Sequence, residues 1–213
     1  MNKMIIKLAL VLLMATMVFS PQQTDAKSRQ QDTYTQKEVA LNSDMRRLWT
    51  DHVTWTRSYI VSAIGGLEDQ DAVLSRLLQN QKDIGNAIQP YYGDAASKKL
   101  AELLTEHIII AGELIEAAKN NDQANVDKFT KQWYANADEI AQFLSDANPN
   151  WSKKTLKGLL DEYLALVTDQ VVFRIQKRWD DDIKAYDEGE THILKLADTL
   201  SDGIIKQFPD KFK

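Results

Sequence analysis

Three histidines, His52, His107 and His192, are the residues of this 213-residue chain whose type and spacing could support chemistry. An acidic residue directly precedes two of them, Asp51 before His52 and Glu106 before His107. Near neutral pH an imidazole can carry a proton or bind a divalent transition metal. Inside an apolar core it must instead find a hydrogen-bond partner. The histidines therefore indicate either polar layers that specify helix packing, or a site for a metal or a small polar ligand.

The segments around the first two histidines belong to an internal repeat. LWTDHV at 48–53 matches LLTEHI at 103–108, and LLDEYL at 159–164 is a weaker third copy in which Tyr163 takes the place of the imidazole. The spacing between copies is about 55 residues, which is typical of a repeated supersecondary unit.

A second set of matching segments follows the first. Asn80 to Ile84 and Asn136 to Ile140 share the pattern Asn, two residues, acid, Ile, and the acids are Asp83 and Glu139. In the third copy, one register aligns Tyr186 to Ile193 with Trp133 to Ile140, so that His192 stands where the acid stands. Another register would use Asp202 instead, and the sequence leaves both open.

The elements that carry these residues have the period of helices. Apolar residues recur at intervals of three or four from residue 36 to residue 208, with breaks near Gly65-Gly66, Pro90 to Asp94, Asn120 to Asp122 and Asn148 to Asn150. No segment alternates as a strand would. We expect an all-α fold of six helices, arranged as three antiparallel hairpins (36–91, 93–148 and 152–208) that pack as a bundle or a short solenoid.

This arrangement predicts a site in the core. Asp83 would face His52, and Glu139 would face His107. Bundles build metal sites from inward carboxylates and histidines on facing helices. The predicted metal ligands are His52, Asp83, His107, Glu139, Glu188 and His192, and the predicted ligand-binding residues are Asn80, Asn136, Glu106 and Tyr163. The cofactor would be a divalent transition metal, whose identity the sequence does not rank.

Composition excludes several other classes of function. There is no cysteine, so a disulfide framework and thiolate chemistry are excluded. The net charge of −5 argues against nucleic acid as a partner. No glycine-rich nucleotide loop and no Gly-x-Ser-x-Gly elbow is present, so a non-enzymatic role is favoured over an enzymatic one. The run Asp180-Asp181-Asp182 is typical of a solvated helix start.

The N-terminus predicts export. Lys3 and Lys7 precede a short apolar run, and polar residues then lead to Ala26, so residues 1–26 are predicted to be a signal peptide. Residues 27–35 would form a flexible leader and residues 36–208 one helical domain. We expect a secreted or cell-envelope protein with no transmembrane segment in the mature chain.

Four stretches carry a resemblance to known proteins: LWTDHVTWTR (48–57), NQKDIGNAIQPYYGD (80–94), WYANADEIAQFL (133–144) and ADTLSDGIIKQFPDKF (197–212). They resemble a group of small secreted helical proteins from spore-forming Gram-positive bacteria, some labelled glycosyltransferase or acetylglutamate kinase. Those labels imply α/β nucleotide-binding folds, which this sequence does not support. The resemblance implies an extracellular location and places His52 and Asp83 in the group's characteristic motifs.

The function expected from these observations is a secreted helical bundle that binds a metal ion or a small polar ligand through its buried His and carboxylate layers. The alternative is a structural or protein-interaction module of the cell envelope, in which the His layers only specify helix packing. Its partners would be a small ligand, a metal or a cell-envelope protein.

Overall fold

The structure is a computed structural model that describes residues 34–213. The predicted signal peptide, 1–26, and all but the last two residues of the predicted leader, 27–35, lie outside the described residues. The predicted helical domain, 36–208, lies within them.

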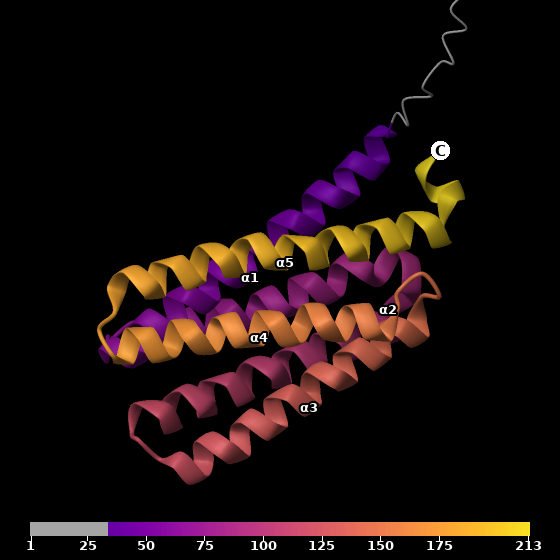
Figure 1. Cartoon of the computed structure of the whole chain (residues 1–213). Coiled ribbons are helices and arrows are strands. Elements are labelled where there is room, and N and C mark those ends of the chain that lie inside the picture. The colour runs from indigo at the N-terminus through magenta and orange to yellow at the C-terminus, as the bar shows by residue number, and fades with distance from the viewer. Residues whose placement is uncertain (1–33) are drawn as a thin grey trace, which may run out of the picture. The chain divides into compact units, whose positions relative to one another are not determined.

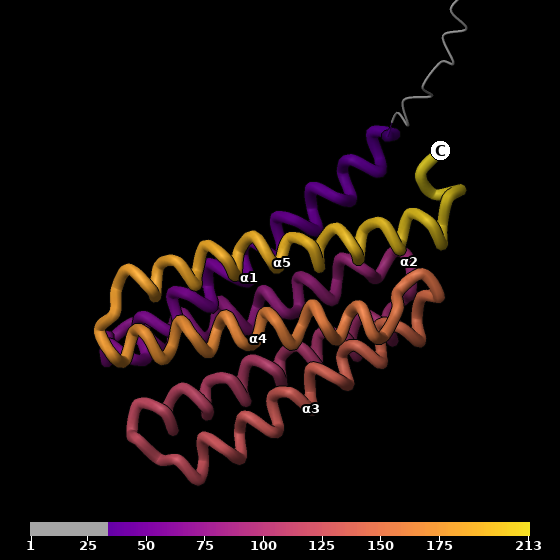
Figure 2. Tube along the Cα trace, in the orientation of Figure 1, coloured from indigo at the N-terminus to yellow at the C-terminus, as the bar shows by residue number. Residues whose placement is uncertain are grey.

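Residues 34–213 form an all-α antiparallel bundle with no strand (Figure 1). Its five α-helices and one 3-10 helix are α1 (Gln36–Gly65), α2 (Gln70–Lys119), α3 (Gln123–Ala147), α4 (Lys153–Ile175), α5 (Trp179–Gln207) and η1 (Pro209–Phe212). The Cα trace shows that the connections between successive helices are short (Figure 2).

Local sequence determines where several helices begin and end. Thr35 and Glu38 form a capping box at the start of α1, each side chain accepting a hydrogen bond from the other's backbone N–H. Ser152 caps α4 through the N–H of Thr155. Gly66, with φ of 64°, ends α1 in the left-handed conformation that glycine adopts without strain.

The prediction of six helices is wrong, because two of the predicted helices are joined into α2. Gly93 interrupts α2 with φ 81° and ψ 176°, and Pro90 lies just before it. A Cβ added to Gly85 would lie 2.7 Å from the Ser97 carbonyl oxygen and 2.8 Å from the Ala101 Cβ. Residues so far apart along a straight helix could not be so close, so α2 folds back on itself at Gly93. Gly93 alone thus makes the chain reversal that was predicted as a turn of several residues.

The order of packing closes the bundle. The helices α1 and α2, α2 and α3, and α4 and α5 pack as neighbours, α3 contacts α4, and α5 packs against α1. The contact between α1 and α5 brings the two ends of the helical domain together, as Figure 1 shows. Of the two predicted architectures, the described residues therefore form a bundle rather than an open solenoid.

Apolar side chains form a continuous core from Leu41 and Met45 near the start of α1 to Phe212 in η1, and buried polar side chains lie among them. Among residues 34–213, no helix combines the length and the hydrophobicity that crossing a bilayer requires.

Candidate functional site

One hydrogen bond recurs three times in the bundle. A side chain on one helix donates to the backbone carbonyl of a leucine on the preceding helical segment. The three bonds are Asn80 Nδ2 to Leu48 O (3.0 Å), Asn136 Nδ2 to Leu103 O (3.2 Å) and His192 Nε2 to Leu159 O (2.8 Å). The three leucines are the matching first residues of the repeat segments, so the sequence match corresponds to a shared contact.

This contact decides the register of the third repeat. His192 occupies the position of Asn80 and Asn136, and not the position of the acid Glu139. The alignment of Tyr186 to Ile193 with Trp133 to Ile140 is therefore wrong by three residues. Sequence similarity does not reveal this register, because histidine and asparagine are not similar residues. Both nevertheless carry an N–H group that can donate to the leucine carbonyl.

The side chain of His107 is contacted by residues of its own hairpin. Its Nδ1 donates to Asn136 Oδ1 at 2.8 Å, and its ring stacks on Trp133 with 5.2 Å between centroids. Asn136 thus serves both the imidazole and the Leu103 carbonyl. Burial lowers the pKa of His107 from 6.5 to about 4, because a charged imidazole would lose its hydration. The ring is neutral at neutral pH.

The side chain of His52 is likewise contacted by an amide, in this case that of Gln81. Its Nδ1 lies 3.3 Å from Gln81 Nε2, which also donates to Leu77 O at 2.8 Å. The ring meets the edge of Trp49 at 5.5 Å. Burial, together with the nearby His107, lowers the pKa of His52 to about 3. It too is neutral at neutral pH.

Tyr163, the third member of the repeat set, meets the two histidines at the centre of the bundle. Its ring lies 5.8 Å from that of His52, and burial raises the pKa of its hydroxyl. His52, His107 and Tyr163 line a cavity of about 20 Å³. A cavity needs about 10–15 Å³ on this measure to hold one water. The centre of the bundle therefore has room for a water-sized group and not for an organic ligand.

The predicted carboxylate partners are not in the core. Asp83 accepts from Gln79 Nε2 at 2.9 Å and lies 4.0 Å from Arg76, on the outer side of its helix. Glu106, Glu139 and Glu188 are exposed. The predicted pairs Asp83 with His52 and Glu139 with His107 are therefore wrong: in each segment the asparagine and the isoleucine are buried, and the acid lies at the edge of that buried stripe, toward solvent.

The predicted metal ligands consequently do not converge. His52 and His107 lie in the centre, His192 between α4 and α5, and the three acids on the surface. Within residues 34–213, no group of three or more His, Asp or Glu side chains is placed to hold a metal ion.

His192 differs from the other two histidines in one respect. Its Nε2 bonds the Leu159 carbonyl, and its Nδ1 lies 3.3 Å from Glu162 Oε1 without forming a hydrogen bond. The imidazole is buried, whereas the Glu162 side chain is 63% exposed. The edge of this ring thus reaches the surface groove between α4 and α5.

A buried carboxylate was missed by the sequence analysis. Asp182 is fully buried and is held by both terminal nitrogens of Arg57, and by Arg174 NH1 at 3.0 Å. The expectation that the run 180–182 is a solvated helix start holds for Asp180, which is exposed, and fails for Asp182. The ion pairs join α1, α4 and α5 at one end of the bundle. The helical period could have predicted the burial of Asp182, since it lies three residues before the buried Ala185 and therefore on the same face of α5.

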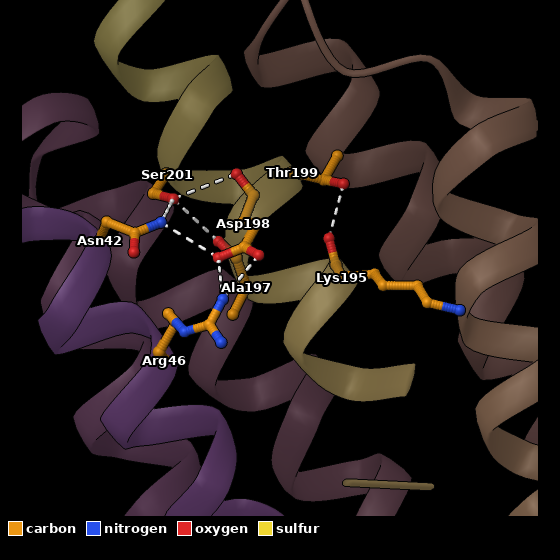
Figure 3. A network of polar contacts seen from close by, with 7 residues as sticks. All are labelled: Asn42, Arg46, Lys195, Ala197, Asp198, Thr199 and Ser201. Carbon is orange, nitrogen blue, oxygen red and sulfur yellow. Dashed lines mark hydrogen bonds and ion pairs between the residues drawn. The ribbon is translucent and has the colours of Figure 1, made fainter. Parts of the chain in front are cut away.

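A second polar network joins α1 to α5 near the other end (Figure 3). Arg46 NH1 donates to both oxygens of Asp198 at 2.8 and 2.7 Å, and Asn42 Nδ2 donates to Asp198 Oδ1 and to Ser201 Oγ. A groove of about 360 Å³ lies beside it, lined also by Tyr34 and Asp202. Asn42, Arg46, Asp198 and Ser201 are bonded to one another, and this network positions α5 against α1.

Comparison of the chain with protein-family models, with curated proteins and with solved structures gave no match.

Proposed function

We propose that this chain is a non-enzymatic helical module that is exported and serves as a structural or protein-interaction part of the cell envelope. In this proposal the histidine layers of the core specify which helices pair. The observation that carries it is the closure of His52 and His107 by amide side chains, Gln81 and Asn136. The Nδ1 of each buried neutral imidazole thus has a partner within the bundle, and this nitrogen needs no further ligand.

The repeated hydrogen bond supports a construction from three related hairpins, 36–91, 93–148 and 152–208. In each, the second helix donates to the leucine carbonyl of the first. A slip of the helices in register would cost free energy, since the buried side-chain donor would lose its partner. The contact therefore favours one pairing of helices over others.

Metal or ligand binding by these layers receives less support. The carboxylates that would accompany the histidines lie on the surface, and the cavity between the rings is of water size. An interaction role is supported by the α4–α5 hairpin, which exposes Val172, Trp179 and Ile183 by 39, 50 and 53%. Exposed aromatic side chains with neighbouring arginines, here Arg174 over the Trp179 ring, are frequent at protein interfaces.

The proposal is tested by proton NMR of the histidine rings. The chain has three histidines, so their Cε1 protons can be assigned by three substitutions. We expect the signals of His52 and His107 to stay fixed when zinc or a chelator is added and when the pH is varied from 8 to 6. A zinc-dependent shift at either ring would contradict the proposal and restore the core as a ligand site.

Export is tested separately. If residues 1–26 are a signal peptide, the protein recovered from the medium or the envelope begins at Lys27, and mass spectrometry of the intact chain gives the cleavage site. Recovery of the uncleaved chain would mean that the apolar run serves as an anchor.

A further inference from the structure

We propose that His192 and Glu162 form a surface site for a divalent transition metal ion, with zinc as the ion of choice for testing it. This site is distinct from the core layers and lies in the groove between α4 and α5.

The hydrogen bond to Leu159 determines which ring nitrogen of His192 carries a proton. A carbonyl oxygen only accepts, so Nε2 must donate, and in the neutral ring Nδ1 then holds a lone pair. A histidine that binds a metal through one nitrogen commonly donates its other N–H to a backbone carbonyl, which fixes the tautomer and orients the ring. His192 is oriented in this way before any metal binds.

The free nitrogen faces a second acceptor. Nδ1 of His192 has no hydrogen-bond partner among the described residues, although the side chain is only 4% exposed, and it lies 3.3 Å from Glu162 Oε1. A lone pair and a carboxylate oxygen repel each other at this distance unless a positive species lies between them. That species is a proton or a metal ion.

The distance is compatible with a metal ion. An N–H donor in an ion pair with a carboxylate lies about 2.7–2.9 Å from the oxygen. Zinc binds nitrogen and oxygen ligands at about 2.0–2.2 Å in a tetrahedral arrangement, which places two such ligands roughly 3.3 Å apart. The separation of Nδ1 and Oε1 equals this second value.

The groove supplies the surroundings that such an ion requires. It measures about 390 Å³, and Asp187 and Glu188 line it together with Glu162 and His192. Lys184 and Lys195 also line it, and Lys184 lies 3.8 Å from Glu188. We assign two protein ligands, His192 Nδ1 and a Glu162 oxygen, with water completing the coordination, which implies weaker binding than at a closed structural zinc site.

The repeat provides independent support. At the position of His192 the other two hairpins have asparagine, which makes the same bond to the leucine carbonyl. Packing alone therefore does not require an imidazole here. The acid at the position of Glu162 is present in all three copies, as Asp51 and Glu106, but only in the third copy does an imidazole nitrogen meet it.

The test is a titration of the purified protein with zinc, followed by calorimetry and by the Cε1 proton of His192. The parent protein should bind one zinc ion at this site with a shift of the His192 signal. His192→Asn restores the residue of the other hairpins, should fold normally, and should abolish the binding. Glu162→Gln should weaken it by at least about tenfold, a loss comparable to that seen when groups around a metal site are removed.

The matched control is Glu106→Gln, the equivalent exposed acid of the second hairpin, which has no imidazole opposite it. It should leave zinc binding unchanged. The proposal is overturned if the parent protein binds no zinc, if His192→Asn binds as well as the parent, or if Glu106→Gln weakens binding as much as Glu162→Gln. These outcomes concern His192 alone, so they are separate from a zinc effect on His52 or His107.

Discussion

The first two hairpins and the third place different chemistry at the same positions. In the first two, the buried imidazole lies on the first helix and an amide on the second, and every contact of that layer is uncharged. In the third, Tyr163 replaces the imidazole and His192 replaces the amide. The third hairpin also contains Asp182, the one buried Asp, Glu, Lys or Arg among residues 34–213.

The comparison shows that the surroundings of an imidazole, more than its presence, determine what it can do. His52 and His107 lie at the centre, where desolvation lowers their pKa values and an amide side chain contacts the Nδ1 of each ring. His192 lies between α4 and α5. Its ring is buried, and its Nδ1 lies 3.3 Å from the exposed carboxylate of Glu162. The former stabilise packing and the latter has a nitrogen available for a ligand.

The largest effect expected from this difference is a loss of stability in acid. The folded pKa values of His52 and His107, about 3 and about 4, lie below the ordinary value of 6.5, so below pH 6.5 the unfolded chain binds protons that the folded chain does not. The stabilisation is complete above pH 6.5 and is lost as the pH falls toward the folded values. At 1.36 kcal/mol per pKa unit, the two rings should lower the free energy of unfolding by on the order of 4 kcal/mol between pH 7.5 and 5.

Urea unfolding at the two pH values measures this loss. The interval lies above the ordinary pKa values of Asp and Glu, so their contribution is small. The double variant with His52→Gln and His107→Gln should lose most of the pH dependence, whereas a His192→Asn variant should keep it. A parent protein equally stable at pH 7.5 and pH 5 would show that the two rings are not desolvated.

The second largest effect concerns the charge buried in the third hairpin. Asp182→Asn leaves Arg57 and Arg174 without their carboxylate, and should lower the free energy of unfolding by about 3 kcal/mol, the low end for a broken buried ion pair. The low end applies because the two arginine side chains remain about 20% exposed. Thermal or urea unfolding measures the change. The control, Asp181→Asn, removes only a surface pair with Arg178 and should change stability by less than about 1 kcal/mol.

A third experiment separates the observed amide partner of His107 from the acid expected from the sequence. Asn136→Ala leaves the buried His107 Nδ1–H without its partner and removes the side-chain hydrogen bond to the Leu103 carbonyl, and should cost about 2–3 kcal/mol in urea unfolding. Glu139→Ala removes the exposed acid and should have an effect within about 0.5 kcal/mol. If the two variants were equally destabilised, Glu139 would be the partner of the imidazole after all.

The all-α class and the antiparallel packing of the helices could be predicted because apolar residues recur at the helical period over the whole domain. The number of helices could not. Pro90 and Gly93 resemble the punctuation of a loop, but Gly93 reverses the chain by itself through a positive φ. Whether one residue or several make a turn depends on the close approach of Gly85 to Ser97 and Ala101, which is a tertiary contact.

The candidate site was predictable only in part, for a related reason. The burial of His52, His107 and Tyr163 follows from their place on the apolar stripe. The partners of these residues could not be predicted in the same way. Asn136 and Glu139 lie only three residues apart on the second helix, and the sequence pattern favoured the charged residue, whereas Asn136 is the partner of His107. The contact between Glu162 and His192 joins α4 and α5. It could be predicted only from the register of these helices, which the hydrogen bond from His192 to the Leu159 carbonyl establishes.

The smallest effect on stability is expected for His192→Asn, and this variant tests the comparison most directly. Asparagine makes the same bond to a leucine carbonyl in both other hairpins, at 3.0 and 3.2 Å, so the amide should replace the imidazole N–H. The smaller side chain loses some packing against α4, and we expect a cost of about 1 kcal/mol or less in urea unfolding. A loss of 3 kcal/mol or more would mean that the third hairpin depends on the whole ring, and the three layers would then not be equivalent. A near-neutral result would show that the imidazole is dispensable for folding, as expected if its role lies in the contact of its Nδ1 with Glu162.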